Sequence, residues 1–409
     1  MPHNSKISCF SKDTRVAVLF QRFGPYHHAR LNAAGRLMTI CGIESCGMEN
    51  TYAWDKVEGA AAFTRITLTE REKDTREWRR DLRRKMWQAL DDFTPDVVAL
   101  PGWSHIDALS ALKWCASNQT PALVMSESTS WDERRVFWKE WVKKRLVNMI
   151  SAGLAGGTPH EKYLVQLGLA PERIFLGYDV VDNDYFSQRA SVARADAPNL
   201  RQKFNLPEKY FLASARFIEK KNLLGLLQAY AGYCDLAKNE IWSLVLLGDG
   251  PLKPQLKQLI VDLKLESYVH LPGFKQYHDL PVYFGLASAF VHASTTEQWG
   301  LVVNEAMASG LPVLVSDRCG CSIDLVSSGD NGYQFDPKNL NELTKLFLKL
   351  STPGFALANF GMASRKIVSR WGPDCFANGL RDAVAVALKN PHRQLGWIDR
   401  ALLQLMVSR

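Results

Sequence analysis

The sequence predicts an α/β protein built from two doubly wound domains, each with a parallel sheet. Short apolar runs that suit buried strands alternate with longer helix-like stretches along almost all of the 409 residues. A chain of this length also exceeds the usual size of a single hydrophobic core, so two domains are expected. Hydrophobic residues make up 46% of the chain, which is enough to fill two cores.

The candidate strands fall into two sets along the chain. Each is a short apolar run, as expected for a strand that is buried on both faces of a parallel sheet. The first set comprises residues 16–21, 42–46, 64–68, 96–100, 121–126, 152–156 and 174–181, and the second comprises residues 210–215, 242–248, 269–272, 289–294, 312–317 and 332–335.

A polar segment separates the two sets. Residues 183–207 are short of apolar periodicity, which predicts an interdomain linker. The N-terminal domain then covers residues 1–182 and the C-terminal domain covers residues 208–370. Two further helix-like stretches, residues 371–388 and 398–407, follow the second domain.

Charge and cysteine content limit the class of protein. The formal net charge of +8 favours anionic partners such as nucleotide diphosphates, acidic lipid or nucleic acid. Eight cysteines in a chain of this length do not resemble a secreted disulfide framework. The close pairs Cys41/Cys46 and Cys319/Cys321 lack the additional ligands of a zinc site, which favours reduced packing cysteines.

The sequence favours a cytoplasmic protein. No signal-peptide pattern begins at Met1. No apolar run reaches the roughly 18–20 residues that span a bilayer, so any membrane contact is expected to be peripheral.

The most informative segment for function lies between residues 297 and 316. A short apolar strand precedes it, and Gly300 is predicted to open a helix that Gly310 closes. The unpaired amides of Gly300, Leu301 and Val302 would point beyond the carboxyl edge of the sheet and form an anion site. A phosphate is the expected guest.

Two glutamates flank this predicted anion site. Glu305 lies one helical turn past Leu301 on the same face, so it can reach the hydroxyls of a ribose. Glu297, in the loop before the helix, can reach a sugar. The segment therefore suits a nucleotide diphosphate sugar.

With these residues in place, the segment resembles the Glu-x7-Glu motif of glycosyltransferase family 4, the group 1 glycosyltransferases. That motif continues Glu-Ala-Met-Ala-x-Gly-x-Pro-Val, as residues 305–313 do here, although Gln298 and Trp299 replace the usual Gly-Phe. The resemblance implies the GT-B fold, in which two Rossmann-like domains face each other across a cleft. It also implies that a C-terminal helix within residues 371–409 returns to the first domain.

Further segments of the second domain extend the resemblance. Arg216 and Lys221 resemble the family's Arg and Lys that grip the diphosphate, and such cations can neutralise a departing phosphate without a metal. Gly248 belongs to a turn similar to the family's Gly-x-Gly-Pro loop. Phe274 and Lys275 follow a segment similar to the one that receives the nucleobase, and Phe274 could equally belong to the core.

One segment departs from the family pattern. Residues 317–326 match the family's Gly-Gly-x-x-Glu-x-Val stretch only in part, because Cys321 replaces a glycine and Asp324 replaces the glutamate. The identity of the donor sugar does not follow from this loop.

The first domain carries weaker candidates for the acceptor or donor site. Gly24 follows the first strand, where it would let the backbone approach a ligand. His27 and His28 beside it are either bases or structural hydrogen-bonding residues. Glu127 stands where many relatives carry a histidine near the donor sugar, although a helix cap explains it equally well. His105, beyond the predicted strand of residues 96–100, is a second candidate for the same role.

Two basic stretches in the first domain interleave cations with aromatic residues. Residues 76–87 and 131–146 both look helical and amphipathic. They could rest on anionic lipid with Trp138 and Trp141 at the interface, or form solvated helix faces over the domain core. The Asp182-Asn-Asp184 run resembles the metal signature of a different glycosyltransferase fold and is discounted.

Together these observations and the resemblance predict a glycosyltransferase that moves a sugar from a nucleotide diphosphate donor to an acceptor hydroxyl, and the resemblance implies that it retains the anomeric configuration. Polysaccharide, lipopolysaccharide or glycolipid assembly is the favoured context, with a saccharide or lipid-linked acceptor, no nucleic acid partner and no metal cofactor. A sugar-nucleotide epimerase or hydrolase, and a non-enzymatic basic surface-binding protein, remain alternatives. A nicotinamide-dependent dehydrogenase is disfavoured because no Gly-x-Gly-x-x-Gly follows the first strand.

Overall fold

The computed structural model describes residues 11–48, 61–73, 75–237, 240–390 and 395–408. The chain divides into two compact units, and each is described by itself. Unit 1 comprises Met1–Val180 and Pro373–Arg409, and unit 2 comprises Val181–Gly372.

Unit 1 contains a seven-stranded parallel sheet with the strand order β3-β2-β1-β4-β5-β6-β7. Its central strands are buried on both faces, as Val16, Val98 and Val124 at 0% exposure illustrate. The strands are β1 (Arg15–Phe20), β2 (Thr39–Met48), β3 (Thr64–Arg71), β4 (Val97–Pro101), β5 (Ala122–Ser126), β6 (Ala152–Ala155) and β7 (Ile174–Leu176).

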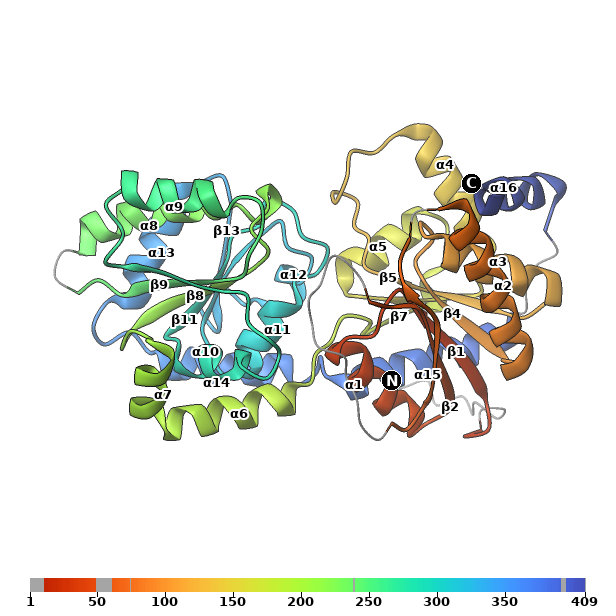
Figure 1. Ribbon diagram of the computed structural model, residues 1–409, viewed down its shortest axis with the longest axis horizontal. Helices are drawn as coiled ribbons and strands as arrows, with labels where there is room; N and C mark the ends of the chain where they lie inside the picture. Colours follow the sequence, from red (N-terminus) through yellow and green to blue (C-terminus); the bar gives the residue numbers. More distant parts are fainter. Residues whose placement is uncertain (1–10, 49–60, 74, 238–239, 391–394, 409) are drawn as a thin grey trace. The chain divides into compact units, whose positions relative to one another are not determined.

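Helices cover this sheet, and two of them come from the C-terminal part of the chain (Figure 1). Helix α15 packs against α1, β6 and β7, and α16 packs against α3 and α4. The helices of unit 1 are α1 (Pro25–Gly35), α2 (Arg76–Phe93), α3 (Ile106–Asn118), α4 (Phe137–Val147), α5 (Thr158–Gln166), α15 (Pro373–Lys389) and α16 (Trp397–Ser408), with a 3-10 turn, η1, at Pro171–Arg173.

Unit 2 contains a six-stranded parallel sheet with the order β10-β9-β8-β11-β12-β13. A cluster of aromatic rings that includes Phe211, Tyr233 and Phe347 fills the space between this sheet and its helices. The strands are β8 (Tyr210–Ser214), β9 (Ser243–Leu247), β10 (Val269–Gly273), β11 (Ala289–His292), β12 (Val313–Ser316) and β13 (Gly332–Phe335).

The helices of unit 2 begin before its first strand. They are α6 (Asn183–Ala195), α7 (Ala197–Phe204), α8 (Leu223–Ala237), α9 (Lys253–Asp262), α10 (Leu280–Leu286), α11 (Leu301–Ala308), α12 (Ser322–Leu325), α13 (Leu340–Ser351) and α14 (Leu357–Val368), with the 3-10 turn η2 at Glu219–Lys221 (Figure 1).

Each predicted strand overlaps an observed strand, but the predicted linker is wrong as a structural element. Residues 183–207 form α6 and α7, which pack on α10 and belong to unit 2. Phe186, Ala190 and Ala193 supply the buried face of α6. The predicted strand 174–181 ends early, at Leu176, where Gly177 adopts a left-handed φ of 110°.

The loops that follow the strands of a parallel sheet gather at its carboxyl edge, where ligands of open α/β sheets bind.

Among the residues that the structure describes, no helix is long and apolar enough to cross a membrane.

Candidate active site

The loops at the carboxyl edge of the unit 2 sheet are joined by backbone hydrogen bonds. The amide of Phe217 donates to the carbonyl of Asp249 over 2.8 Å, and the amide of Gly248 donates to the carbonyl of Gly273 over 3.1 Å. Gly248 has a φ of 131°, and a Cβ atom there would lie 1.9 Å from the carbonyl oxygen of Ala215. The turn therefore requires glycine both for its conformation and for space.

Helix α11 begins at this edge with its first amides unpaired within the helix. Gly300 is its N-terminal cap residue with a left-handed φ of 104°, and no side chain caps the helix. The amides of Leu301 and Val302 belong to the first turn, whose donors lack an intrahelical acceptor, and both residues are only partly buried. The start of α11 thus has the geometry of an anion site.

Glu297 lies in the loop before α11, among polar side chains from two other segments. Its Oε2 atom forms an ion pair with the Nζ atom of Lys221. The same oxygen lies 3.4 Å from Nε2 of His292 and 3.5 Å from Oγ of Ser294. The side chains of Lys221 and Glu297 are 13% and 12% exposed, so the pair is largely shielded from water.

The charge on Glu297 is stabilised by these neighbours. Burial alone would raise the pKa of its carboxyl group, but the hydrogen bond with His292 and the charge of Lys221 outweigh burial and lower that pKa below its usual range. Glu297 is therefore an anion at neutral pH. Burial, followed by the charge of Lys221, lowers the pKa of His292, so its imidazole is neutral.

His292 is a site residue that the sequence analysis missed. It is the last residue of β11, and it is 3% exposed. A histidine that ends an otherwise apolar strand five residues before Glu297 was the available signal. Its side chain faces the same edge as Glu297 because the end of the strand lies at the carboxyl edge.

Arg216 and Lys221 both lie in the segment between β8 and α8. Lys221 ends the 3-10 turn η2, and the amide of Thr295 donates to the carbonyl of Lys220 over 2.9 Å. This bond ties the Lys221 segment to the Glu297 loop. Arg216 is partly buried two residues after the end of β8.

Glu305 lies in α11 and is 1% exposed. Its charge acts on Tyr277. Burial, and then the charge of Glu305, raises the pKa of the Tyr277 hydroxyl. The Tyr277 ring stacks on the Tyr185 ring with centroids 4.7 Å apart. Sequence analysis missed both tyrosines, which come from the loop after β10 and from the predicted linker.

The predicted nucleobase segment follows β10. Gly273 has a φ of 83°, and Phe274 beside it is 40% exposed, so Phe274 is not a core residue. The Nζ atom of Lys275 lies 5.6 Å from the centroid of the Tyr283 ring. Both side chains thus lie at the end of a strand that borders β9.

Two residues that depart from the family pattern, Trp299 and Cys321, have side chains packed inside unit 2. Trp299 is buried, and its Nε1 donates to Oδ1 of Asn304 over 2.9 Å. Cys319 and Cys321 are free and buried. The amide of Gly320 donates to the carbonyl of Glu297 over 3.1 Å. This backbone hydrogen bond joins the Cys-Gly-Cys segment to the Glu297 loop.

In unit 1, the glycine and histidine after β1 have a structural role. Gly24 caps α1, and its amide donates to Nδ1 of His27 over 3.0 Å. Burial, followed by the charge of Arg30, lowers the pKa of His27 to about 3. Burial and then Arg65 also lower the pKa of His28, whose Nδ1 lies 3.0 Å from Nδ2 of Asn32.

Glu127 directly follows β5, near a buried ion pair. Arg30 and Asp179 lie 3.7 Å apart, each with a side chain 3% exposed. Burial and then the charge of Glu127 raise the pKa of Asp179 well above its usual range. His105 lies elsewhere on this edge and contacts the side-chain amide of Gln21.

The Asp182–Asp184 run has a local structural role. Asp182 caps α6 by accepting a hydrogen bond from the amide of Tyr185 over 3.0 Å. Within the described parts of the chain, no group of three or more His, Cys, Asp or Glu side chains is placed to hold a metal ion.

The class of fold is established by solved structures. A glycosyltransferase from Rickettsia africae aligns with 92% of this chain and 99% of that one (TM-score 0.72, 14% identity). Anabaena Alr3699/HepE, solved in complex with UDP and glucose, aligns with 89% and 97% (TM-score 0.67, 19% identity). The chain therefore has the GT-B fold with two Rossmann-like domains.

Sequence comparison places unit 2 near a particular group. Residues 196–366 match the family model described as glycosyl transferases group 1. Alpha-monoglucosyldiacylglycerol synthase of Acholeplasma laidlawii is 32% identical over 38% of this chain and 39% of its own length. The amylovoran biosynthesis glycosyltransferase AmsK of Erwinia amylovora is 29% identical over 48% and 44%. The matched region spans less than half of each of these relatives.

Proposed function

We propose that this protein is a retaining glycosyltransferase of family 4 that transfers a sugar from a nucleotide diphosphate to an acceptor hydroxyl. The observation that carries the proposal is the Lys221–Glu297 ion pair beside the first turn of α11. It brings a cation, a carboxylate and unpaired amides to one edge of the sheet, within the region that matches group 1 glycosyltransferases.

In the proposed complex, the diphosphate binds at the start of α11. The amides of Gly300, Leu301 and Val302 contact its oxygens, and Arg216 and Lys221 balance its charge. Donor binding then replaces part of the Lys221–Glu297 contact with a Lys221–phosphate contact.

The remaining donor groups take the polar and aromatic side chains around the diphosphate. Glu297, an anion at neutral pH, accepts hydrogen bonds from the sugar hydroxyls. Glu305 does the same for the ribose. Phe274 and Lys275 contact the nucleobase, and the turn at Gly248 lets the backbone approach the donor.

The proposed reaction is a front-side displacement. The bond between the anomeric carbon and the diphosphate oxygen breaks, and the acceptor oxygen bonds to that carbon on the same face. The acceptor proton passes to the departing phosphate oxygen. Arg216, Lys221 and the amides of α11 stabilise the charge that develops on the leaving group, so no metal ion is needed.

Unit 1 is proposed to receive the acceptor, a saccharide or a lipid-linked sugar. Gly24 and Glu127 lie at the carboxyl edge of its sheet, where an acceptor hydroxyl would be oriented. The names of the relatives, a glucosyldiacylglycerol synthase and an amylovoran glycosyltransferase, favour glycolipid or polysaccharide assembly.

The test is calorimetric titration of the purified protein with UDP, GDP, ADP and NADH without added metal. One nucleoside diphosphate is expected to bind, and Glu305→Gln should weaken it about 10- to 100-fold, as expected for a lost hydrogen bond to a charged group. Glu266→Gln, on the exposed surface of unit 2, is the matched control. A folded protein that binds none of the three nucleoside diphosphates, or that binds only NADH, contradicts the proposal.

The reaction itself is tested with the sugar derivative of the nucleotide that binds. Retention predicts a product whose anomeric configuration equals that of the donor, as read by NMR. Release of free sugar in the absence of any acceptor, at the same rate as in its presence, would indicate a hydrolase instead.

A further inference from the structure

Unit 1 exposes large aromatic side chains on two helices. Phe137, Trp138 and Trp141 of α4 are 88%, 62% and 43% exposed, and Trp397 at the start of α16 is 79% exposed. Side chains of this size are normally buried, and a cluster of them on a surface marks an interaction site.

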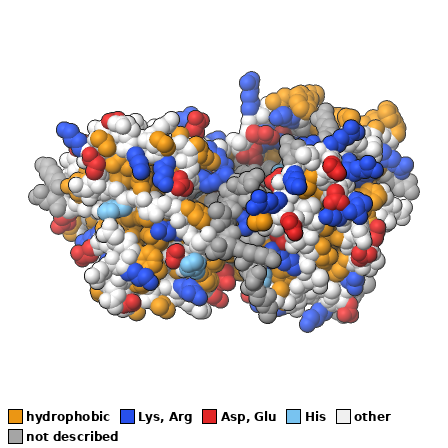
Figure 2. Space-filling model, in the orientation of Figure 1, with side chains coloured by type: hydrophobic (Ala, Val, Ile, Leu, Met, Phe, Trp, Pro, Cys, Tyr) orange, Lys and Arg blue, Asp and Glu red, His pale blue; other side chains and the backbone are white. Residues whose placement is uncertain are grey.

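The two helices form one surface. Helix α16 packs against α4, and Nη1 of Arg145 in α4 lies 3.1 Å from Oδ1 of Asp399 in α16. Figure 2 shows hydrophobic and basic side chains gathered at the upper edge of unit 1, where Figure 1 places α4 and α16. We call the exposed side chains of α4 and α16 the α4–α16 surface.

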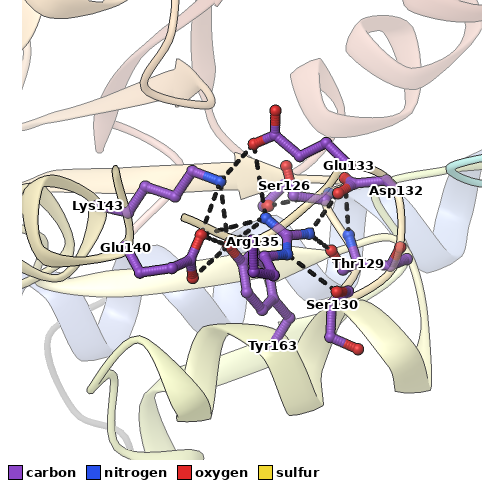
Figure 3. Close-up of polar contacts among 10 residues, drawn as sticks. Ser126, Thr129, Ser130, Asp132, Glu133, Arg135, Glu140, Lys143 and Tyr163 are labelled. Atoms are coloured by element: carbon purple, nitrogen blue, oxygen red, sulfur yellow. Dashed lines mark hydrogen bonds and ion pairs between the residues drawn. The ribbon is translucent and has the colours of Figure 1, made fainter. Parts of the chain in front are cut away.

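Internal contacts hold α4 and the loop before it in a defined position (Figure 3). Arg135 bonds to the carbonyl of Ser130 over 2.9 Å and to the Tyr163 hydroxyl over 2.7 Å. Lys143 pairs with Glu133 over 2.7 Å and with Glu140 over 3.2 Å. The aromatic residues are therefore exposed on a helix that is already anchored to the body of unit 1.

This network also separates the cations of the basic stretch into two groups. Arg135 and Lys143 are used inside unit 1, whereas Arg134, Lys139 and Lys144 are exposed. The Nζ atom of Lys139 lies 5.9 Å from the centroid of the Trp138 ring. Exposed cations thus alternate with exposed aromatic rings on α4.

The other basic stretch does not share this arrangement. In α2, Arg84 and Lys85 pair with Asp81 over 2.7 Å and 2.8 Å, and Arg83 bonds to the carbonyl of Val407. These three cations have partners within the protein, and no residue of α2 is among the exposed large hydrophobic residues.

We infer that the α4–α16 surface docks on a bilayer that contains anionic lipid. Indole rings favour the zone between lipid headgroups and acyl chains, and exposed lysines and arginines are attracted to the negative potential of such a surface. The cationic character disfavours a second copy as the occupant, because two such surfaces would repel each other. This inference does not depend on the proposed transferase activity.

The experiment measures co-sedimentation of the full chain with vesicles of phosphatidylcholine alone or mixed with equal parts of phosphatidylglycerol. Binding is expected to the mixed vesicles and to be much weaker for phosphatidylcholine alone. The double variant Trp138→Ser/Trp397→Ser should lower the partition coefficient about tenfold or more, because two rings leave the interface. Met362→Ser/Val192→Ser, two exposed apolar residues of unit 2, should leave it unchanged.

A second pair of variants tests the charge component. Lys139→Gln/Lys144→Gln should lower the partition coefficient for the mixed vesicles about tenfold. Added salt should also lower the partition coefficient of the wild type. Lys209→Gln/Lys257→Gln removes the same charge from exposed positions of unit 2 and should change little. Each variant should unfold thermally with the same midpoint as the wild type, which is the check that its fold is kept.

Several results would overturn the inference. They are absence of vesicle binding, equal binding to both kinds of vesicle, and equal losses in the surface variants and their controls. A wild-type dimer that Trp138→Ser/Trp397→Ser converts to a monomer would also overturn it, because the surface would then serve self-association. Nucleotide titration of the same variants is expected to match the wild type, so a failure of docking is distinguishable from a failure of the proposed function.

Discussion

Lys221 and Glu297 form an ion pair although 76 residues separate them in the sequence. Lys221 follows β8 and Glu297 follows β11, and these two strands are neighbours in the sheet. The pair therefore joins the loop proposed to hold the diphosphate with the loop proposed to hold the sugar. Without a donor, each side chain satisfies the charge of the other.

Lys221→Met is expected to lower the rate of transfer at saturating donor by about 10²–10³-fold, because the leaving phosphate loses a cation that acts most strongly in the transition state. The affinity for donor should fall less. Steady-state kinetics gives both quantities, and Lys257→Met, on the exposed face of α9, is the control. A loss confined to the KM for donor would assign Lys221 to ground-state binding alone.

The contacts of Glu297 predict a dependence of stability on pH. Its pKa in the folded protein lies below the ordinary value of 4.5, mainly because the His292 hydrogen bond and Lys221 outweigh burial. The stabilisation is thus complete above pH 4.5 and is lost as the pH falls through the lower pKa of the folded state. Glu297→Gln should reduce stability by about 1–3 kcal/mol at pH 7.

That difference should narrow as the pH falls below 4.5, since the Glu297 carboxyl group of the unfolded chain then takes up a proton while the folded protein keeps it ionised down to its lower pKa. Urea denaturation at several pH values measures it, with Glu266→Gln as the control for an exposed carboxylate. A constant difference between pH 7 and acid conditions would mean that the ion pair does not stabilise the folded state.

The strands were predictable from the sequence because each is an apolar run that the sheet buries on both faces. Helix α6 was missed even though Phe186, Ala190 and Ala193 follow helical spacing, because the polar residues between them dominated the composition. Glu297 and Lys221 could be assigned to one edge from strand ends alone. The role of His292 depends on a side-chain contact that spacing does not reveal.

Gly248→Ala should disrupt the loop that follows β9. A methyl group there would meet the Ala215 carbonyl at 1.9 Å, and the φ of 131° already disfavours alanine. Gly329→Ala separates the two effects, because Gly329 has a φ of 88° and an added Cβ has no atom within 4 Å. Gly329→Ala should cost about 1–2 kcal/mol of unfolding free energy from strain alone.

Gly248→Ala should cost about 1–3 kcal/mol more, because the backbone must also move away from the new atom. The same variant should weaken nucleotide binding, whereas Gly329→Ala should not. Chemical denaturation and calorimetry on both variants provide the comparison. Equal stability losses would show that the contact with Ala215 relaxes without cost.

His27 predicts a separate acid sensitivity in unit 1. Its Nδ1 atom accepts the amide of Gly24, its ring centroid lies 4.3 Å from that of Phe20, and its pKa falls from 6.5 to about 3. The unfolded chain takes up this proton near pH 6.5, whereas the folded protein does so only near pH 3. Stability is therefore complete above pH 6.5 and declines between pH 6.5 and 3.

His27→Gln removes this titration and keeps an acceptor for the helix cap, as glutamine does at the same position of a capping box. Between pH 7 and pH 4, the wild type is expected to lose about 1–3 kcal/mol more free energy of unfolding than the variant. This range follows from about 1.4 kcal/mol per unit of pKa difference between the folded and unfolded states. His278→Gln, whose side chain is 69% exposed, should follow the wild type. Parallel pH profiles for His27→Gln and the wild type would show that His27 titrates normally and that its environment does not exclude the charged form.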